Sequence, residues 1–78
     1  MNRKSAEISE EEAELLSYLY ALHGNQTKRL IRGGWESGDY SPLGFLRDDQ
    51  VALLQRLRNA HGPSWLTYLS WQSVMERS

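Results

Sequence analysis

Apolar residues recur at helical spacing in four stretches of this chain, and no stretch alternates polar and apolar side chains for long enough to predict a β-strand. Glycine and proline residues separate the four stretches. Short helices that each carry one apolar stripe bury it by packing against one another. The sequence therefore predicts an all-α fold, a compact bundle of four short helices with a structured glycine- and proline-containing loop between the second and the third.

The first helix has a strong start signal. Ser9 supplies an oxygen acceptor at the N-cap, and Glu12 stands at the matching position of a capping box. The helix is expected to run from about Glu10 to His23 and to end at Gly24, because glycine can adopt the left-handed conformation that closes a helix. Its apolar stripe is expected to consist of Leu15, Leu16, Leu19 and Leu22, with Tyr18 beside them.

The second helix is predicted to begin after Asn25, which can act as its N-cap. One of its sides carries Leu30, Ile31 and Trp35, and the other carries Lys28, Arg29 and Arg32. Gly33 and Gly34 each weaken a helix by roughly 1 kcal/mol relative to alanine. The helix is therefore expected to fray or bend at this pair. We attribute the presence of the glycines to packing, because two adjacent glycines let another backbone approach closely.

The loop after the second helix contains turn-forming residues and shows no sustained helical period. Ser41 and Pro42 are expected to start a single helical turn. Leu43, Phe45 and Leu46 are expected to fold down from it as a hydrophobic plug. The sequence thus predicts a structured loop whose apolar side chains point inward.

The third and fourth helices meet at a glycine followed by a proline. Asp48 or Asp49 is expected to cap the third helix, Gly62 to end it, and Pro63 to open the last one, which should span about residues 63–76. The buried stripe of the third helix is expected to be Leu53, Leu54, Leu57 and either Ala60 or His61. In the last helix, Trp65, Leu66 and Leu69 are assigned to the core.

The composition indicates a folded cytoplasmic protein. A length of 78 residues predicts a single domain, residues 1–78, of which residues 1–8 are expected to be flexible. The chain has no cysteine, its N-terminus lacks the apolar region of a secretory signal, and its longest uncharged run is too short and too polar to span a bilayer. The formal net charge of −1 argues against wholesale nucleic-acid binding, because phosphate neutralisation needs a basic surplus.

Nothing in the sequence predicts an enzyme, a metal site or a cofactor. The chain contains no nucleophile elbow, phosphate-binding loop or dinucleotide fingerprint, and its two histidines lack metal-ligand spacing. His23 and His61 both fall at predicted helix ends, where a protonated imidazole interacts favourably with the helix dipole. We therefore expect a protein that acts without catalysis.

The last segment predicts a surface that meets another protein. Its apolar and aromatic residues cover more of the helix than three short helices could bury, and Trp, Tyr and Met are enriched at interface cores. The residues predicted to bind a partner are Trp71, Val74, Met75 and Tyr68, together with Trp35 and Tyr40 of the loop region. The alternative interpretation places Tyr68 and Trp71 on the rim of a wide core. The partner would be a host protein or complex that this chain occludes, and a homodimer closed by the last helix is a further hypothesis.

A second functional hypothesis is a small DNA-binding accessory factor or repressor. Lys28, Arg29 and Arg32 could contact phosphates, and the two helices flanking Gly24 loosely resemble a helix-turn-helix pair. Asn25 stands where that motif usually has an apolar anchor, which favours an acidic protein partner or solvent for the basic side chains. No membrane partner is predicted.

The middle of the chain resembles an uncharacterised family of small helical proteins from mobile elements of proteobacteria. The residues that carry the resemblance are Gly24, Gln26, Thr27, Lys28, Arg29, Trp35, Gly38, Tyr40 and Asp48. The match covers about half of the chain, which departs from the family by a shorter second helix, by glycines at apolar positions and by one tryptophan in place of two. The resemblance implies no activity. It implies a mobile-element or phage setting, in which small proteins often inhibit host proteins, CRISPR effectors included.

Overall fold

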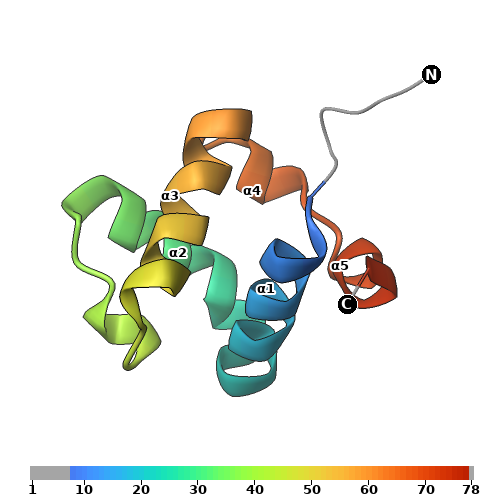
Figure 1. Cartoon of the computed structure of the whole chain (residues 1–78), viewed down its shortest axis with the longest axis horizontal. Helices are drawn as coiled ribbons and strands as arrows, with labels where there is room; N and C mark the ends of the chain where they lie inside the picture. The colour runs from blue at the N-terminus through green and yellow to red at the C-terminus, as the bar shows by residue number, and fades with distance from the viewer. Residues whose placement is uncertain (1–7, 78) are drawn as a thin grey trace.

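The computed structural model describes residues 8–77, which form helices and no strand, so the predicted all-α fold is confirmed (Figure 1). The α-helices are α1 (Glu10–His23), α2 (Thr27–Ser37), α3 (Asp48–His61), α4 (Trp65–Tyr68) and α5 (Trp71–Arg77). Two 3-10 turns, η2 (Gly24–Gln26) and η3 (Ser41–Leu43), precede and follow α2. Together the elements make a small helical globule.

Helix α1 has the predicted bounds and the predicted capping box. The backbone N–H of Glu12 donates to Ser9 Oγ at 3.1 Å, and the backbone N–H of Ser9 donates to Glu12 Oε1 at 2.8 Å. Ile8, expected to belong to a flexible terminus, is instead buried against the core, while residues 1–7 lie outside the described residues. Leu22 was expected in the buried stripe, but it lies near the end of α1 and is 57% exposed.

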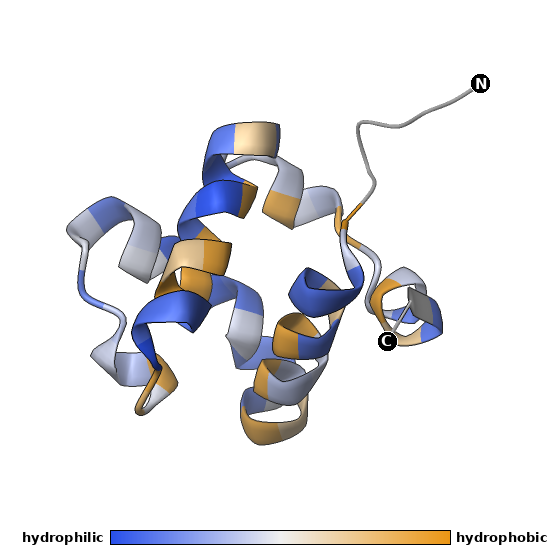
Figure 2. Cartoon of the chain, in the orientation of Figure 1, coloured by the Kyte–Doolittle hydropathy of each residue, from blue (hydrophilic) through white to orange (hydrophobic). Residues whose placement is uncertain are grey.

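One core joins all the α-helices. Leucines of α1 meet apolar residues of α2, α3, α4 and α5, and Figure 2 shows hydrophobic and hydrophilic residues alternating along α1 and α3, as helices with one buried face require. The fully buried large apolar side chains are Leu16, Leu19, Ile31, Leu43, Leu54, Leu57, Leu66 and Val74. Trp65 and Leu69, assigned to the core from the sequence, pack against this cluster but are only partly buried.

Helix α2 begins and continues differently from the prediction. Asn25 lies in the 3-10 turn η2 and the N-cap of α2 is Gln26, without a side-chain capping bond, so the predicted cap is wrong. The Thr27 hydroxyl donates to the Gly24 carbonyl at 2.7 Å and ties the turn to the helix. The helix does not fray at Gly33 and Gly34 but continues to Ser37. It ends at Gly38, whose φ of 82° is the left-handed conformation that glycine adopts without strain.

The glycine pair in α2 makes room for an aromatic ring rather than for a backbone. A Cβ atom on Gly34 would lie 2.6 Å from Cε1 of Tyr40, whereas a Cβ on Gly33 would meet nothing within 4 Å. Next to this contact, the Trp35 indole N–H donates to the Leu54 carbonyl at 3.0 Å and ties α2 to α3. Only the second glycine of the pair is therefore explained by packing.

The loop between α2 and α3 is structured, as predicted, but only part of the plug forms. Ser41 and Pro42 begin the 3-10 turn η3, Leu43 is 1% exposed and Leu46 packs partly against the core. The carbonyl of Leu43 accepts a hydrogen bond from His23 Nε2 at 2.9 Å. Phe45 was expected to fold inward, but its side chain is 89% exposed.

Helix α3 ends at Gly62 as predicted, but neither aspartate is its N-cap. The helix begins at Asp48, so Arg47 is the N-cap residue, and its backbone N–H donates to Gln50 Oε1 at 2.9 Å. A guanidinium has no acceptor, so this is only the reciprocal half of a capping box. The negative charges of the two aspartates still stabilise the first turn, because the N-terminal end of the helix dipole is positive.

The segment predicted as one last helix is broken in two. Helix α4 covers four residues after a turn that contains Pro63, and Leu69 is extended (φ −64°, ψ 130°) before α5 begins. The Leu69 carbonyl accepts a hydrogen bond from the Lys28 ammonium group at 2.5 Å. This long-range bond compensates for the intrahelical bond that the break removes. The break turns α5 onto α1, beside which it lies in Figure 1.

The contact between Gly34 and Tyr40 predicts opposite effects for two adjacent substitutions. Gly33→Ala should raise the free energy of unfolding by up to about 1 kcal/mol, because alanine is the better helix former and nothing crowds its methyl group. Gly34→Ala should lower it, because the methyl group displaces the Tyr40 ring. Urea unfolding followed by circular dichroism measures both, and equal effects of the two changes would contradict the contact.

Candidate functional site

Most residues of the patch predicted in the last segment pack against other parts of the chain. Val74 is fully buried in the core, which corrects its assignment to an exposed surface. Trp71 is half-buried, and its ring stacks on Tyr20 of α1 with centroids 4.5 Å apart, while the Lys28 ammonium lies 5.8 Å from the Trp71 centroid. Met75 is 40% exposed, and its sulfur accepts a hydrogen bond from Ser17. These contacts fasten α5 to α1.

The other predicted aromatic residues differ in how far they are exposed to solvent. Trp35 is 7% exposed and hydrogen-bonded inside the core, so it is not a surface residue. Tyr40 is half-buried over Gly34, and this burial raises the pKa of its hydroxyl. Tyr68 alone among the six predicted partner-binding residues is widely exposed, at 84%.

Two of the three cations of the predicted basic face bind other parts of the chain. Lys28 donates to the Leu69 carbonyl, and Arg32 donates to the hydroxyl of Thr67 on α4. Arg29 is exposed and makes no hydrogen bond or ion pair to the described residues. Contact with nucleic-acid phosphates would therefore compete with the bonds that hold the last segment, which weakens the DNA-binding hypothesis.

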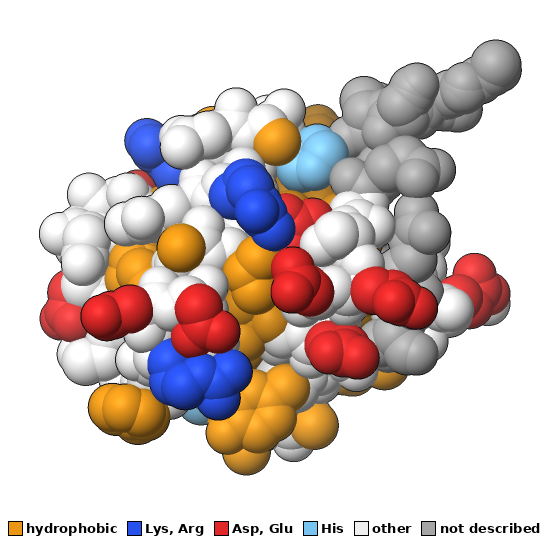
Figure 3. Space-filling view, viewed as in Figure 1, with side chains coloured by type: hydrophobic (Ala, Val, Ile, Leu, Met, Phe, Trp, Pro, Cys, Tyr) orange, Lys and Arg blue, Asp and Glu red, His pale blue; other side chains and the backbone are white. Residues whose placement is uncertain are grey.

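Two exposed aromatic side chains border a furrow between α1 and α3. Tyr18, on α1, is 52% exposed, and Phe45, in the loop that leads into α3, is 89% exposed. Figure 3 shows hydrophobic atoms between the two helices on this face, with acidic side chains on both sides. We call this furrow the α1–α3 groove.

The groove consists of three hollows that share residues. The first hollow lies at the Phe45 end, the second between the two helices and the third beside Ala52, and none is enclosed. Tyr18, Arg47 and Gln50 line both the first and the second. Glu11, Asp49 and Leu53 line both the second and the third. The shared residues make the hollows one continuous surface.

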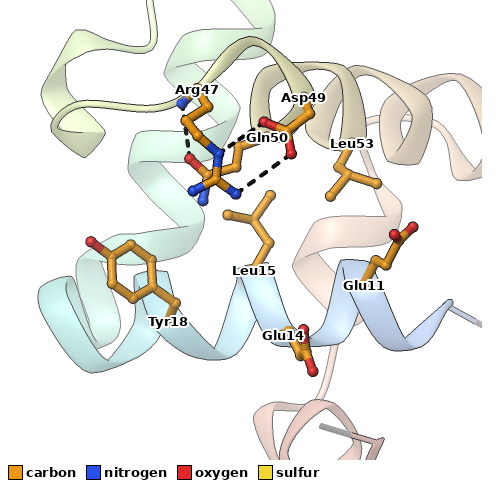
Figure 4. A pocket seen from close by; sticks show the side chains of 8 residues that line it. All are labelled: Glu11, Glu14, Leu15, Tyr18, Arg47, Asp49, Gln50 and Leu53. Carbon is orange, nitrogen blue, oxygen red and sulfur yellow. Dashed lines mark hydrogen bonds and ion pairs between the residues drawn. The ribbon is translucent and has the colours of Figure 1, made fainter.

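The floor of the groove is apolar and its sides are charged. In Figure 4 the side chains of Leu15, from α1, and Leu53, from α3, point toward each other. Glu11 rises from α1 toward α3, Glu14 lies on the outer edge of α1, and Arg47 and Asp49 lie at the start of α3 (Figure 4). An apolar floor between charged sides is the usual layout of a protein-binding surface, with its apolar centre and polar rim.

The charges around the groove do not balance. Arg47 Nε lies 3.1 Å from Asp49 Oδ1, and this bond lowers the pKa of Asp49, which keeps the pair ionised. Arg56 Nε lies 3.3 Å from Oε2 of the buried Glu12. Each groove guanidinium thus already has a carboxylate. Glu11 and Glu14 form no ion pair within the described part of the chain, which leaves the groove acidic.

The groove is an open surface without a cluster of metal-ligand side chains among the described residues. Within residues 8–77 no three His, Asp or Glu side chains are grouped as metal ligands would be. The hollows are open to solvent, whereas a small-molecule site encloses most of its ligand. The arrangement suits a broad ligand that covers exposed aromatic rings.

The sequence indicated this site only in part. Tyr18 is predicted beside the apolar stripe of the first helix, but Phe45 was expected to point inward. The signal that could have found Phe45 is its place after Gly44 in a loop with two other large apolar residues. Of the three, Leu43 is buried, Leu46 is partly buried and Phe45 is exposed.

Comparisons of the chain with protein-family models, curated protein sequences and solved structures find no match. None of the helices in residues 8–77 is long and apolar enough to cross a membrane.

The exposure of Phe45 predicts that its ring contributes little to the fold. Phe45→Ala should change the free energy of unfolding by less than about 0.5 kcal/mol, because the side chain lies almost wholly in water. Leu43→Ala, two residues away in the same loop, should cost about 2–5 kcal/mol because Leu43 is fully buried. Chemical unfolding of both variants measures the difference, and a comparable loss in Phe45→Ala would show that the ring packs inward.

Proposed function

We propose that this chain is a non-enzymatic protein-binding module that binds its partner through the α1–α3 groove. The observation that carries the proposal is the exposure of Phe45 and Tyr18 at one end of a groove with an apolar floor. The fold buries eight large apolar side chains completely, yet leaves the Phe45 ring 89% exposed. Burial of this ring by a partner would contribute favourable free energy to binding.

The magnitude of that free energy fits an interface anchor. Full burial of a phenylalanine side chain is worth about 1.5–3 kcal/mol, and aromatic residues dominate the small set that carries most binding energy. Tyr18 lies on a helix, so little conformational freedom is lost when its ring is covered. The two rings together supply an exposed aromatic contact.

The action that follows is occlusion of a partner surface. A module that binds without catalysis would change a larger protein by covering part of it, so we place this chain among stoichiometric inhibitors or modulators of a host protein complex. We further propose a mobile-element or phage setting, with action resembling that of CRISPR inhibitors. Only the resemblance of the middle of the chain to a family from mobile elements supports this setting.

The two exposed aromatic residues Phe45 and Tyr68 distinguish the groove from the surface predicted in the last segment. Phe45→Ala should weaken capture of the partner from host lysate at least tenfold, about 1.4 kcal/mol, as expected of an anchor residue. Tyr68→Ala is the matched control, because its ring is exposed to a similar degree and does not line the groove. Tagged wild-type chain and both variants are compared by quantitative mass spectrometry.

The control also supplies the contrary result. A partner that is kept by folded Phe45→Ala and lost by Tyr68→Ala would place the binding surface on α4 and reject the groove. Circular dichroism of each variant confirms that the fold is intact before capture.

A further inference from the structure

We infer that the occupant of the α1–α3 groove is a basic amphipathic helix of the partner protein. The inference rests on the proposed function and adds to it the secondary structure and the charge of the bound segment. Three features carry it: the geometry of the groove walls, the spacing of the apolar contacts and the unpaired acidic side chains.

The walls of the groove are two helices that run in opposite directions. In Figure 4 the residues of α1 progress from Glu11 to Tyr18 in one direction, and those of α3 progress from Asp49 to Leu53 in the other. A helix laid between two helices packs its side-chain ridges into the furrow. A bound strand would need a free sheet edge, and residues 8–77 contain no strand that could provide one.

The length of the groove matches a short helix. Glu11 and Tyr18, which line it toward opposite ends, are separated by about 10 Å of α1 at 1.5 Å per residue. An occupant of two to three turns presents apolar residues at i, i+3 or i+4 and i+7 along that distance. These residues would cover Phe45 and Tyr18 at one end, the Leu15 and Leu53 side chains in the middle, and Ala52 at the other end.

The charges select a basic occupant. Arg47 is paired with Asp49 and Arg56 with Glu12, so the positive charge of each guanidinium is already offset by a carboxylate. Glu11 and Glu14 lack such a partner among residues 8–77 and both line the central hollow, Glu11 on the side toward α3 and Glu14 on the outer edge of α1. Lys or Arg on the flanks of the occupant would pair with them, whereas an acidic helix would be repelled.

Two synthetic peptides test this assignment. Both are three-turn helices held by a side-chain staple and carry the same Leu and Trp stripe, but one has Lys and the other Glu on its flanks. Titration of the ¹⁵N-labelled chain should show that the Lys peptide shifts the amide resonances of residues 11–18 and 45–53. Its affinity should fall as salt is added, and the Glu peptide should bind at least tenfold more weakly.

Charge reversal on the chain gives the matched control. Glu11→Lys with Glu14→Lys should weaken the Lys peptide about tenfold, since two attractions become two repulsions. Glu36→Lys with Glu76→Lys makes the same change in net charge at exposed positions outside the groove and should alter the affinity less than about twofold. If the first variant does not fold, Glu11→Gln with Glu14→Gln replaces it, with a loss of about threefold expected.

The contrary results separate this inference from the proposed function. Equal affinity for the two peptides, or equal loss in both charge-reversal variants, overturns the basic helix. Binding of the Glu peptide to residues 11–18 and 45–53 also overturns it, while leaving the groove as a binding surface. A dimer in sedimentation that buries the groove assigns it to a second copy of this chain and overturns the inference too. The proposed function itself fails only on the Phe45→Ala capture experiment.

Discussion

Burial of the apolar stripe of α1 is the constraint on which the rest of the structure depends. Helices α2, α3 and α5 all contact α1, and Leu16 and Leu19 lie at the centre of the single core. The capping box at Ser9 and Glu12 fixes where α1 begins, and so fixes which of its side chains face inward. A helix flanked in this way still has one uncovered side, and that side carries Glu11, Glu14 and Tyr18.

The last segment shows how the chain covers as much of α1 as it can. The extended Leu69 separates α4 from α5, and Leu66 of α4 and Val74 of α5 are both fully buried. Lys28 makes this break tolerable by binding the freed carbonyl and lying near the Trp71 ring. The residues that suggested a surface patch thus cover one side of α1. The furrow between α1 and α3 stays exposed and forms the groove.

Sequence signals within a few residues of each other correctly predicted several helix ends and one turn. The bounds of α1, the end of α3 at Gly62 and the turn at Ser41 follow from capping and turn preferences of neighbouring residues, and the structure confirms them. The freed carbonyl at the Leu69 break is bound by Lys28, which lies 41 positions earlier, and Gly34 of α2 is contacted by the Tyr40 ring. None of these long-range effects can be read from the spacing of the residues concerned.

The central claim is that the open side of α1, together with α3, meets another protein. The most direct measurement is amide hydrogen exchange of the chain alone and in complex with its captured partner. The account predicts slower exchange across residues 11–18 and 45–53 in the complex, with little change across residues 65–75. Slower exchange confined to residues 65–75 would contradict it.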